Sequence, residues 1–360
     1  MESVYIHIPF CKSICSYCDF CKMLYNGAWV TQYLNILIEE IKDKYNGEEI
    51  KTLYIGGGTP SSLSLKDLKY LFDMLKIFNL NHLEEFTFEC NLDDINLDLL
   101  EFLWNNGVNR LSIGIESFND DKLKFMERKH SFEEAENAIN LARKIGFDNI
   151  NVDLIYGIPG ETLKDLKKDI ELVLKLNPDH ISTYSLIVED NTKIGIMGVL
   201  PISEELDASM YEEICDRLDM RKYEHYEVSN FAKNGKKSKH NLKYWNNEEY
   251  YGFGLGASGY IHGVRYENTR SLTEYLKGNI VKKEEILSKE DTMYNELMLG
   301  FRKMEGINLK NFFLKYGVNM QEVFDLHDVL RDEELIVDGE YIYVNPKYVY
   351  VMNEILIKIL

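Results

Sequence analysis

The sequence of 360 residues predicts an α/β fold, in which an open, partial barrel of six βα units is followed by a smaller α+β domain. Up to about residue 190, short β-rich runs alternate with longer amphipathic stretches. Polar residues suited to a functional site come at or just after several of these runs. Near the C-terminus, helical patterns precede a hairpin pattern, which indicates a separate small module.

Six strands are expected, most of them nearly continuous in apolar or β-branched residues, at 4–8, 52–55, 85–90, 110–115, 150–155 and 180–185. Continuous runs of this kind suit strands that are covered on both faces. Four intervening stretches have the length and period of crossover helices, at 29–45, 65–78, 131–145 and 162–176. A closed barrel needs eight units, so we expect later sequence or substrate to cover the missing side.

Three regions are expected along the chain: the partial barrel over 1–200, a barrel-covering segment over 201–285, and the C-terminal domain over 286–360. Residues 228–266 are rich in Asn, Gly, Lys and aromatics, which indicates irregular structure with short strands. From Lys289 onward, three helical patterns precede two short strands within 334–344, joined by Asp338-Gly339. Helices followed by a hairpin resemble a winged-helix module.

The charge of the chain excludes some functions. Lys and Arg number 41 against 60 Asp and Glu, so the formal net charge is -19 and nucleic acid is not expected as a partner. The winged-helix-like domain is therefore expected to pack or to contact protein. The first residues do not resemble a signal peptide, and no apolar run reaches about 18 residues, so we expect a cytoplasmic protein.

Four of the six cysteines lie within residues 11–21, and Cys11, Cys15 and Cys18 form C-x3-C-x2-C directly after the first strand. In a chain without a signal peptide such a cluster indicates a metal site rather than disulfides. Three thiolates on one short loop can bind three irons of one [4Fe-4S] cube, which leaves the fourth iron free for a small molecule. Cys90 and Cys215 stand alone, and we expect both to be small buried side chains.

Two other kinds of metal site also use clustered cysteines. Structural zinc usually takes paired C-x2-C knuckles, and the sequence has no matching second pair. An electron-transfer cluster would need Cys21 as a fourth ligand. Cys21 follows Cys18 after two residues, which is the opposite order of spacings from the C-x2-C-x2-C-x3-C run of ferredoxins. We expect Cys21 not to bind the cluster, and an electron-transfer module stays open as an alternative.

The segment from Tyr5 to Cys11, YIHIPFC, the three-cysteine loop and Cys18-Asp-Phe20 resemble one branch of the radical S-adenosylmethionine (SAM) proteins. This branch contains the oxygen-independent coproporphyrinogen III oxidases and the HemW-type heme chaperones, and the similarity covers essentially the whole chain. The resemblance implies a radical SAM partial barrel, a [4Fe-4S] cluster on the three cysteines, and SAM on the free iron.

The resemblance also implies the residues that hold SAM. In Gly56-Gly57-Gly58-Thr59-Pro60, glycines let the backbone approach the methionine part closely. Carboxylates can accept from ribose hydroxyls or the ammonium, and Arg128 can pair with a carboxylate. Glu116 departs from the oxidases, which have Gln there. Gly252 to Ser258 would approach the adenosine, without the frame of a dinucleotide fold. The implied set is Tyr5, Tyr17, Gly57, Gly58, Thr59, Glu89, Glu116, Arg128, Asp153 and Ser258.

Three features favour the chaperones over the oxidases. Phe20 stands where the oxidase loop has an extra cysteine, and ten residues precede the cysteine loop where the oxidases have a substantial segment. His240-Asn-Leu-Lys-Tyr-Trp245 resembles the HNxxYW motif of the HemW-like proteins, so His240 is expected as an axial heme ligand beside flat apolar side chains. His7 is expected to lie near the cluster instead.

The expected function is that of a heme chaperone, which binds heme as cargo and passes it to apo-hemoproteins, including membrane-associated ones, and which needs an electron donor. Oxidative decarboxylation of coproporphyrinogen III, a step of porphyrin metabolism, stays open as the alternative. The sequence identifies no catalytic residue and leaves open whether SAM is cleaved and whether the protein is an enzyme.

Overall fold

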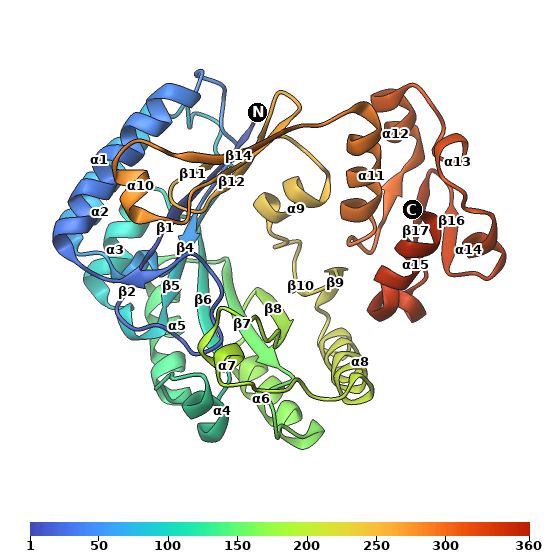
Figure 1. The fold of residues 1–360 in the computed structure, drawn as a ribbon. Helices are drawn as coiled ribbons and strands as arrows, with labels where there is room; N and C mark the ends of the chain where they lie inside the picture. Colours follow the sequence, from blue (N-terminus) through green and yellow to red (C-terminus); the bar gives the residue numbers. More distant parts are fainter.

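A nine-stranded sheet in the order β11-β1-β4-β5-β6-β7-β8-β10-β9 organises the first three quarters of the chain (Figure 1). The computed structural model describes all 360 residues. All six expected strands are confirmed. The strands of the sheet are β1 (Ser3–Ile8), β4 (Thr52–Gly57), β5 (Glu85–Asn91), β6 (Arg110–Glu116), β7 (Ile150–Tyr156), β8 (His180–Ser185), β9 (Glu224–Glu227), β10 (Asn230–Ala232) and β11 (Tyr251–Phe253). The edge strands β9 and β11 do not pair with each other, so the barrel is open.

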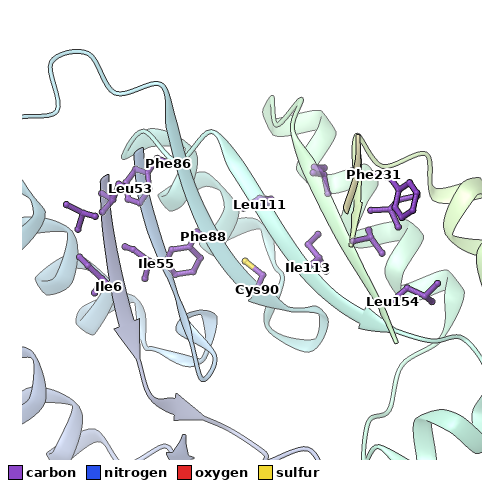
Figure 2. Close-up of a cluster of buried hydrophobic side chains, with 14 of the residues drawn as sticks. Ile6, Leu53, Ile55, Phe86, Phe88, Cys90, Leu111, Ile113, Leu154 and Phe231 are labelled. Atoms are coloured by element: carbon purple, nitrogen blue, oxygen red, sulfur yellow. The ribbon is translucent and has the colours of Figure 1, made fainter. Parts of the chain in front are cut away.

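The strands of the barrel alternate between apolar and polar residues, which corrects the expectation of nearly continuous apolar runs. In β5, Phe86 and Phe88 are buried in the apolar core, whereas Glu89, on the opposite face of the strand, lines a cavity inside the barrel. Figure 2 shows the apolar layer, to which Ile6, Leu53, Ile55, Phe86, Phe88, Cys90, Leu111, Ile113, Leu154 and Phe231 belong. The inner face is polar because it lines a site rather than a core.

Helices cover the apolar side of the sheet. The four expected crossover helices are confirmed, with the second ending in a short 3-10 turn at Leu75–Ile77. The helices up to residue 220 are α1 (Gly27–Lys44), α2 (Leu65–Met74), α3 (Leu97–Asn105), α4 (Asp120–Phe125), α5 (Phe132–Ile145), α6 (Leu163–Leu176), α7 (Lys193–Ile196) and α8 (Glu204–Met220). Ser131 and Thr162 begin α5 and α6 with capping boxes, which satisfy the first amides of each helix.

The segment after residue 200 completes the barrel. Strands β10 and β9 pair antiparallel beyond β8, and β11 pairs parallel to β1 at the other edge. Between them lies α9 (Lys239–Trp245), which carries the histidine motif. A separate sheet contains β12 (Ser258–Ile261), β13 (Val264–Asn268) and β14 (Val281–Ile286), with α10 (Leu272–Leu276) before its last strand. A parallel pair of two-residue strands, β2 (Phe10–Cys11) and β3 (Met23–Leu24), frames the cysteine loop.

The C-terminal domain contains four helices before its hairpin rather than three, because two of them are a single turn long. They are α11 (Lys289–Gly300), α12 (Leu309–Tyr316), α13 (Met320–Val323) and α14 (His327–Arg331). Strands β15 (Ile307–Asn308), β16 (Leu335–Asp338) and β17 (Tyr341–Val344) form its sheet, and α15 (Met352–Ile359) ends the chain. Asp338 pairs with Tyr341, so the turn is Gly339-Glu340, one residue later than expected.

Backbone hydrogen bonds join this domain to the barrel. Val228 donates to the carbonyl of Arg302, and Met304 donates to the carbonyl of Tyr226, both at 3.0 Å. The domain therefore adds to the edge of the main sheet beside β9 (Figure 1). None of the helices is both long enough and apolar enough to cross a lipid bilayer.

Candidate functional site

The cysteine loop leaves the end of β1 and packs against the glycine-rich turn after β4. The Cys11 thiol is buried, and the Thr59 hydroxyl donates to its sulfur at 3.4 Å. Arg128 approaches the sulfur of Cys15, with Nη1 at 3.7 Å. Burial, with a smaller contribution from the nearby Cys18 and Cys15, raises the pKa of Cys11 to about 11. Cys11, Cys15 and Cys18 lie on one loop, but no three His, Cys, Asp or Glu side chains are close enough to hold a single metal ion.

The side chain of Cys21 faces a different part of the molecule. Its sulfur lies 3.9 Å from the carbonyl oxygen of Arg270, beside the loop that contains Gly256. The carbonyl of Cys21 accepts a 2.7 Å hydrogen bond from His7 Nε2, while His7 Nδ1 accepts from the hydroxyl of Tyr5 at 2.9 Å. Burial lowers the pKa of His7 to about 4, so this imidazole is neutral. Its hydrogen bond to the Cys21 carbonyl ties the cysteine loop to β1.

The glycine turn brings backbone close to both the cysteine loop and the barrel interior. Gly57 has a φ of +116°, which favours glycine, and its amide donates to Glu89 at 2.9 Å. The amide of Gly58 donates to the carbonyl of Ile8 at 2.8 Å. A methyl group on Gly58 would lie 2.7 Å from the backbone of Pro9 and 3.0 Å from the sulfur of Cys11. These contacts leave no room for a side chain.

We therefore expect Gly58→Ala to lose at least half of the iron that the wild-type protein binds after anaerobic reconstitution. The added methyl group must displace the backbone of Pro9 and the Cys11 sulfur, at a cost of about 1–3 kcal/mol. Iron and acid-labile sulfide per chain measure the loss. Gly27→Ala is the matched control, because the nearest atom to its new methyl group lies 3.7 Å away. Full iron content in Gly58→Ala would contradict the close approach.

A cavity of about 420 Å³ occupies the barrel interior next to the cysteine loop. Four of the expected SAM residues line it together with Cys18, namely Tyr17, Glu89, Glu116 and Asp153. The exposed side chains of Phe20 and Ile187 form part of its rim. The cavity therefore joins the cysteine loop to the acidic interior of the barrel.

The carboxyl groups in this cavity are costly to ionise. Burial raises the pKa of Glu89 to about 7, although the Tyr54 hydroxyl at 2.7 Å and the Gly57 amide favour its charged form. Burial also raises the pKa of Asp153, opposed by the Asn151 amide at 2.9 Å. Groups of this kind gain most from a bound cation, since it removes the penalty of burying their charge.

Glu116 is held in an unusual backbone conformation. Its φ is +67°, at a β-bulge between β6 and β7, which is costly for a residue with a side chain. Its carboxylate lies 3.7 Å from Arg128 Nη1, and burial raises its pKa to about 7 despite that guanidinium. Arg128 also donates to the side-chain oxygen of Asn91 at 2.8 Å. Glu116 and Arg128 thus connect the cavity to Cys15.

Ser258 does not join the other expected SAM residues. It is exposed at the start of β12 and lines a separate surface pocket with Tyr266 and Lys283. The glycines before it are needed for packing instead, since a methyl group on Gly252 would collide with the backbone of Ser258. Tyr5 does not line the cavity itself. Its ring centre lies 5.9 Å from that of Tyr54, which does line it.

His240 is buried in the floor of the barrel, with both ring nitrogens engaged. Nδ1 lies 2.9 Å from the Thr52 hydroxyl and Nε2 lies 2.7 Å from the Tyr244 hydroxyl. Burial lowers its pKa to about 3, so the imidazole is neutral. Trp245 packs under the guanidinium of Arg302, 4.8 Å from its ring centre. In this conformation the motif presents no free imidazole nitrogen, and Arg302 covers one face of the tryptophan.

Several residues that line the cavity are not among those predicted from the sequence. Tyr54, Arg110, Ser112, Asn151, Ser182, Tyr184 and Asn241 line the same cavity. Most occupy every second position of a barrel strand, so the alternation within 110–116 and 150–155 could have indicated them. Asn241 directly follows His240, the residue of the motif that was predicted to bind heme.

Comparison with protein families divides the chain into two matched regions. Residues 5–173 match the Radical SAM superfamily, and residues 287–347 match the HemN C-terminal domain. Among solved structures, coproporphyrinogen III oxidase (HemN) from Escherichia coli, a radical SAM enzyme, superposes with a TM-score of 0.87 at 23% identity, over 99% of this chain and 89% of that chain. This likeness shows the fold.

Relatives that carry the description heme chaperone HemW match nearly the whole chain. The protein from Lactococcus lactis is 40% identical over 100% of this chain and 97% of its own length. The protein from Bacillus subtilis is 41% identical over 92% of this chain and 91% of its own. The Escherichia coli protein is 34% identical over 94% and 90%, respectively.

Proposed function

Because this chain belongs to the HemW heme chaperone family of the radical SAM superfamily, we propose that it binds a [4Fe-4S] cluster and SAM, and carries heme to apo-hemoproteins. Cys11, Cys15 and Cys18 would bind the cluster, and the SAM residues implied by the resemblance would be those that reach the cavity or the glycine turn. The proposal places the protein in the cytoplasm, with an electron donor and with recipients that include membrane-associated hemoproteins.

The observation that carries the cofactor assignment is the acidic cavity that opens beside the cysteine loop. SAM carries a sulfonium and an ammonium group, and the buried carboxyls of Glu89, Glu116 and Asp153 favour a cationic ligand. If a reduced cluster cleaved SAM, the cofactor would supply radical chemistry in this cavity. The Gly57 and Tyr54 hydrogen bonds hold Glu89 in place before any ligand arrives.

We propose His240 as the heme ligand, although its present contacts must change before it can bind iron. Nε2 can bind iron only after the hydroxyl of Tyr244 moves away, because the two atoms lie 2.7 Å apart. Nδ1 can keep its bond to Thr52, and a bonded second nitrogen is the usual arrangement in metal-binding histidines. Because His240 is also fully buried, heme binding by this residue requires the Tyr244 side chain and its surroundings to rearrange.

A hemin titration with two variants tests this assignment. Tyr244→Phe is expected to keep or strengthen the Soret band, because it releases Nε2, and His240→Ala is expected to weaken hemin binding at least tenfold, about the effect of losing 1.4 kcal/mol. His327→Ala, at an exposed histidine of the C-terminal domain, is the control. Unchanged spectra in His240→Ala would remove the ligand assignment, and no heme binding by the wild-type protein would remove the cargo.

Oxidation of coproporphyrinogen III remains the second candidate, favoured by the likeness of the whole fold to HemN. It predicts protoporphyrinogen when the reconstituted protein is supplied anaerobically with coproporphyrinogen, SAM and a reductant. Absence of product in a preparation that binds heme stably would leave the chaperone proposal standing.

A further inference from the structure

Arg110 is a buried arginine that none of the functions discussed so far uses. It begins β6, is 2% exposed, and lines the barrel cavity with Glu89 and Asp153. Arginine stays charged in proteins, so its burial cannot be relieved by loss of a proton. A buried charge is costly unless an opposite charge and hydrogen bonds compensate it.

The protein itself compensates Arg110 poorly. Its one hydrogen bond is long, from Nη1 to the Thr87 hydroxyl at 3.5 Å, and the buried Nε has no partner. No carboxylate lies at ion-pair distance. Glu89 is bonded to Tyr54 and Gly57 instead. Arg128, by contrast, pairs with Glu116.

Asn241 lines the same cavity as Arg110, and its side chain forms no hydrogen bond within the protein. The residue is the third of α9, and the Glu85 carboxylate fixes the helix start by accepting from the amides of Lys239 and His240 at 2.8 and 3.0 Å. Asn241 is therefore held in place while its amide stays free to donate. A guanidinium and a side-chain amide together match the acceptor oxygens of a carboxylate.

We propose that Arg110 and Asn241 form a subsite for the carboxylate of a small molecule bound in the barrel. The chemistry of the subsite is the same for either ligand of the barrel, since SAM has one carboxylate and heme has two propionates. It gives the asparagine of the HNxxYW motif a binding role that is separate from any role of His240.

The test uses the reconstituted protein and its Arg110→Met variant, titrated with SAM, with hemin and with hemin dimethyl ester, whose propionates are blocked. Methionine fills similar space without charge, and replacing a buried charge by an apolar side chain is often neutral or stabilising. Loss of a charge-assisted hydrogen bond is expected to weaken the carboxylate ligand about tenfold to a hundredfold. Arg217→Met, on the outer helix α8, is the control.

Weaker SAM binding alone would assign the carboxylate to SAM. Weaker hemin binding, with the ester bound equally by both proteins, would assign it to a propionate. Unchanged affinity for both ligands, with a lower melting temperature of the ligand-free variant, would overturn the subsite and make Arg110 a structural residue. If Arg110→Met does not fold, Arg110→Lys keeps the charge but loses the planar fork, and the same two affinities decide. If the wild-type protein does not bind hemin, the proposed function is contradicted. A weaker affinity of Arg110→Met for SAM would still support the subsite.

Discussion

Serine in place of Cys15 is expected to abolish the [4Fe-4S] cluster, the largest effect that any single substitution in this protein should have. Cys11, Cys15 and Cys18 lie on one loop, and three irons of the cube need three thiolates. A serine hydroxyl is not deprotonated near neutral pH and does not replace a thiolate. Iron and sulfide per chain after anaerobic reconstitution are expected to fall to background, together with the EPR signal of the reduced cluster.

Cys21→Ser is the informative comparison, because Cys21 has the same side chain and lies three residues after Cys18. The Cys21 sulfur faces Arg270, so the Cys21→Ser variant is expected to retain four irons per chain. Addition of SAM should still change the EPR signal of this variant. Loss of the cluster in Cys21→Ser would support the electron-transfer alternative, in which four cysteines saturate the irons. Cys215→Ser, on α8, controls for thiol loss elsewhere.

The fold could be predicted largely from sequence because its strands are short, regularly spaced and apolar on the face that packs under the helices. Each of the six expected strands has apolar residues packed under helices, as in the layer of Figure 2. Strand β11 could not be found in this way. It has only three residues, and its pairing with β1 depends on a contact across almost the whole barrel sequence. One helix of the C-terminal domain was missed for a similar reason, since α13 and α14 are each about one turn long and so short a segment carries no periodicity.

Sequence motifs indicated which loops of the candidate site come together. They did not indicate which side chains of those segments point into the cavity. The cysteine loop and the glycine turn meet because both follow adjacent parallel strands. Ser258 follows glycines too, but those glycines serve the packing of β11 against β12. His240 and Asn241 are neighbours in one motif, yet one is sealed in the floor and the other lines the cavity. A helix turns about 100° between successive residues, so the motif alone could not separate them.

Removal of the Glu85 carboxylate is expected to have the second large effect, because it detaches α9 from the floor of the barrel. Glu85 is 2% exposed, and its oxygens accept from the backbone amides of Lys239 and His240. Glu85→Ala leaves two donors without a partner in a buried place, each at about 1–3 kcal/mol. The free energy of unfolding in urea is therefore expected to fall by about 3–5 kcal/mol in total.

The neighbouring Glu84 provides the matched control, since it contacts the same helix from the surface. Its carboxylate lies 2.8 Å from Lys239 Nζ, and an exposed ion pair of this kind contributes about 0–1 kcal/mol. Hydrogen exchange at the amides of residues 239 and 240 should accelerate in Glu85→Ala and stay slow in Glu84→Ala. Equal effects of the two substitutions would mean that α9 is held by its packing alone. A selective effect would show that one buried carboxylate sets where both His240 and Asn241 point, and so controls the two binding roles proposed for the motif.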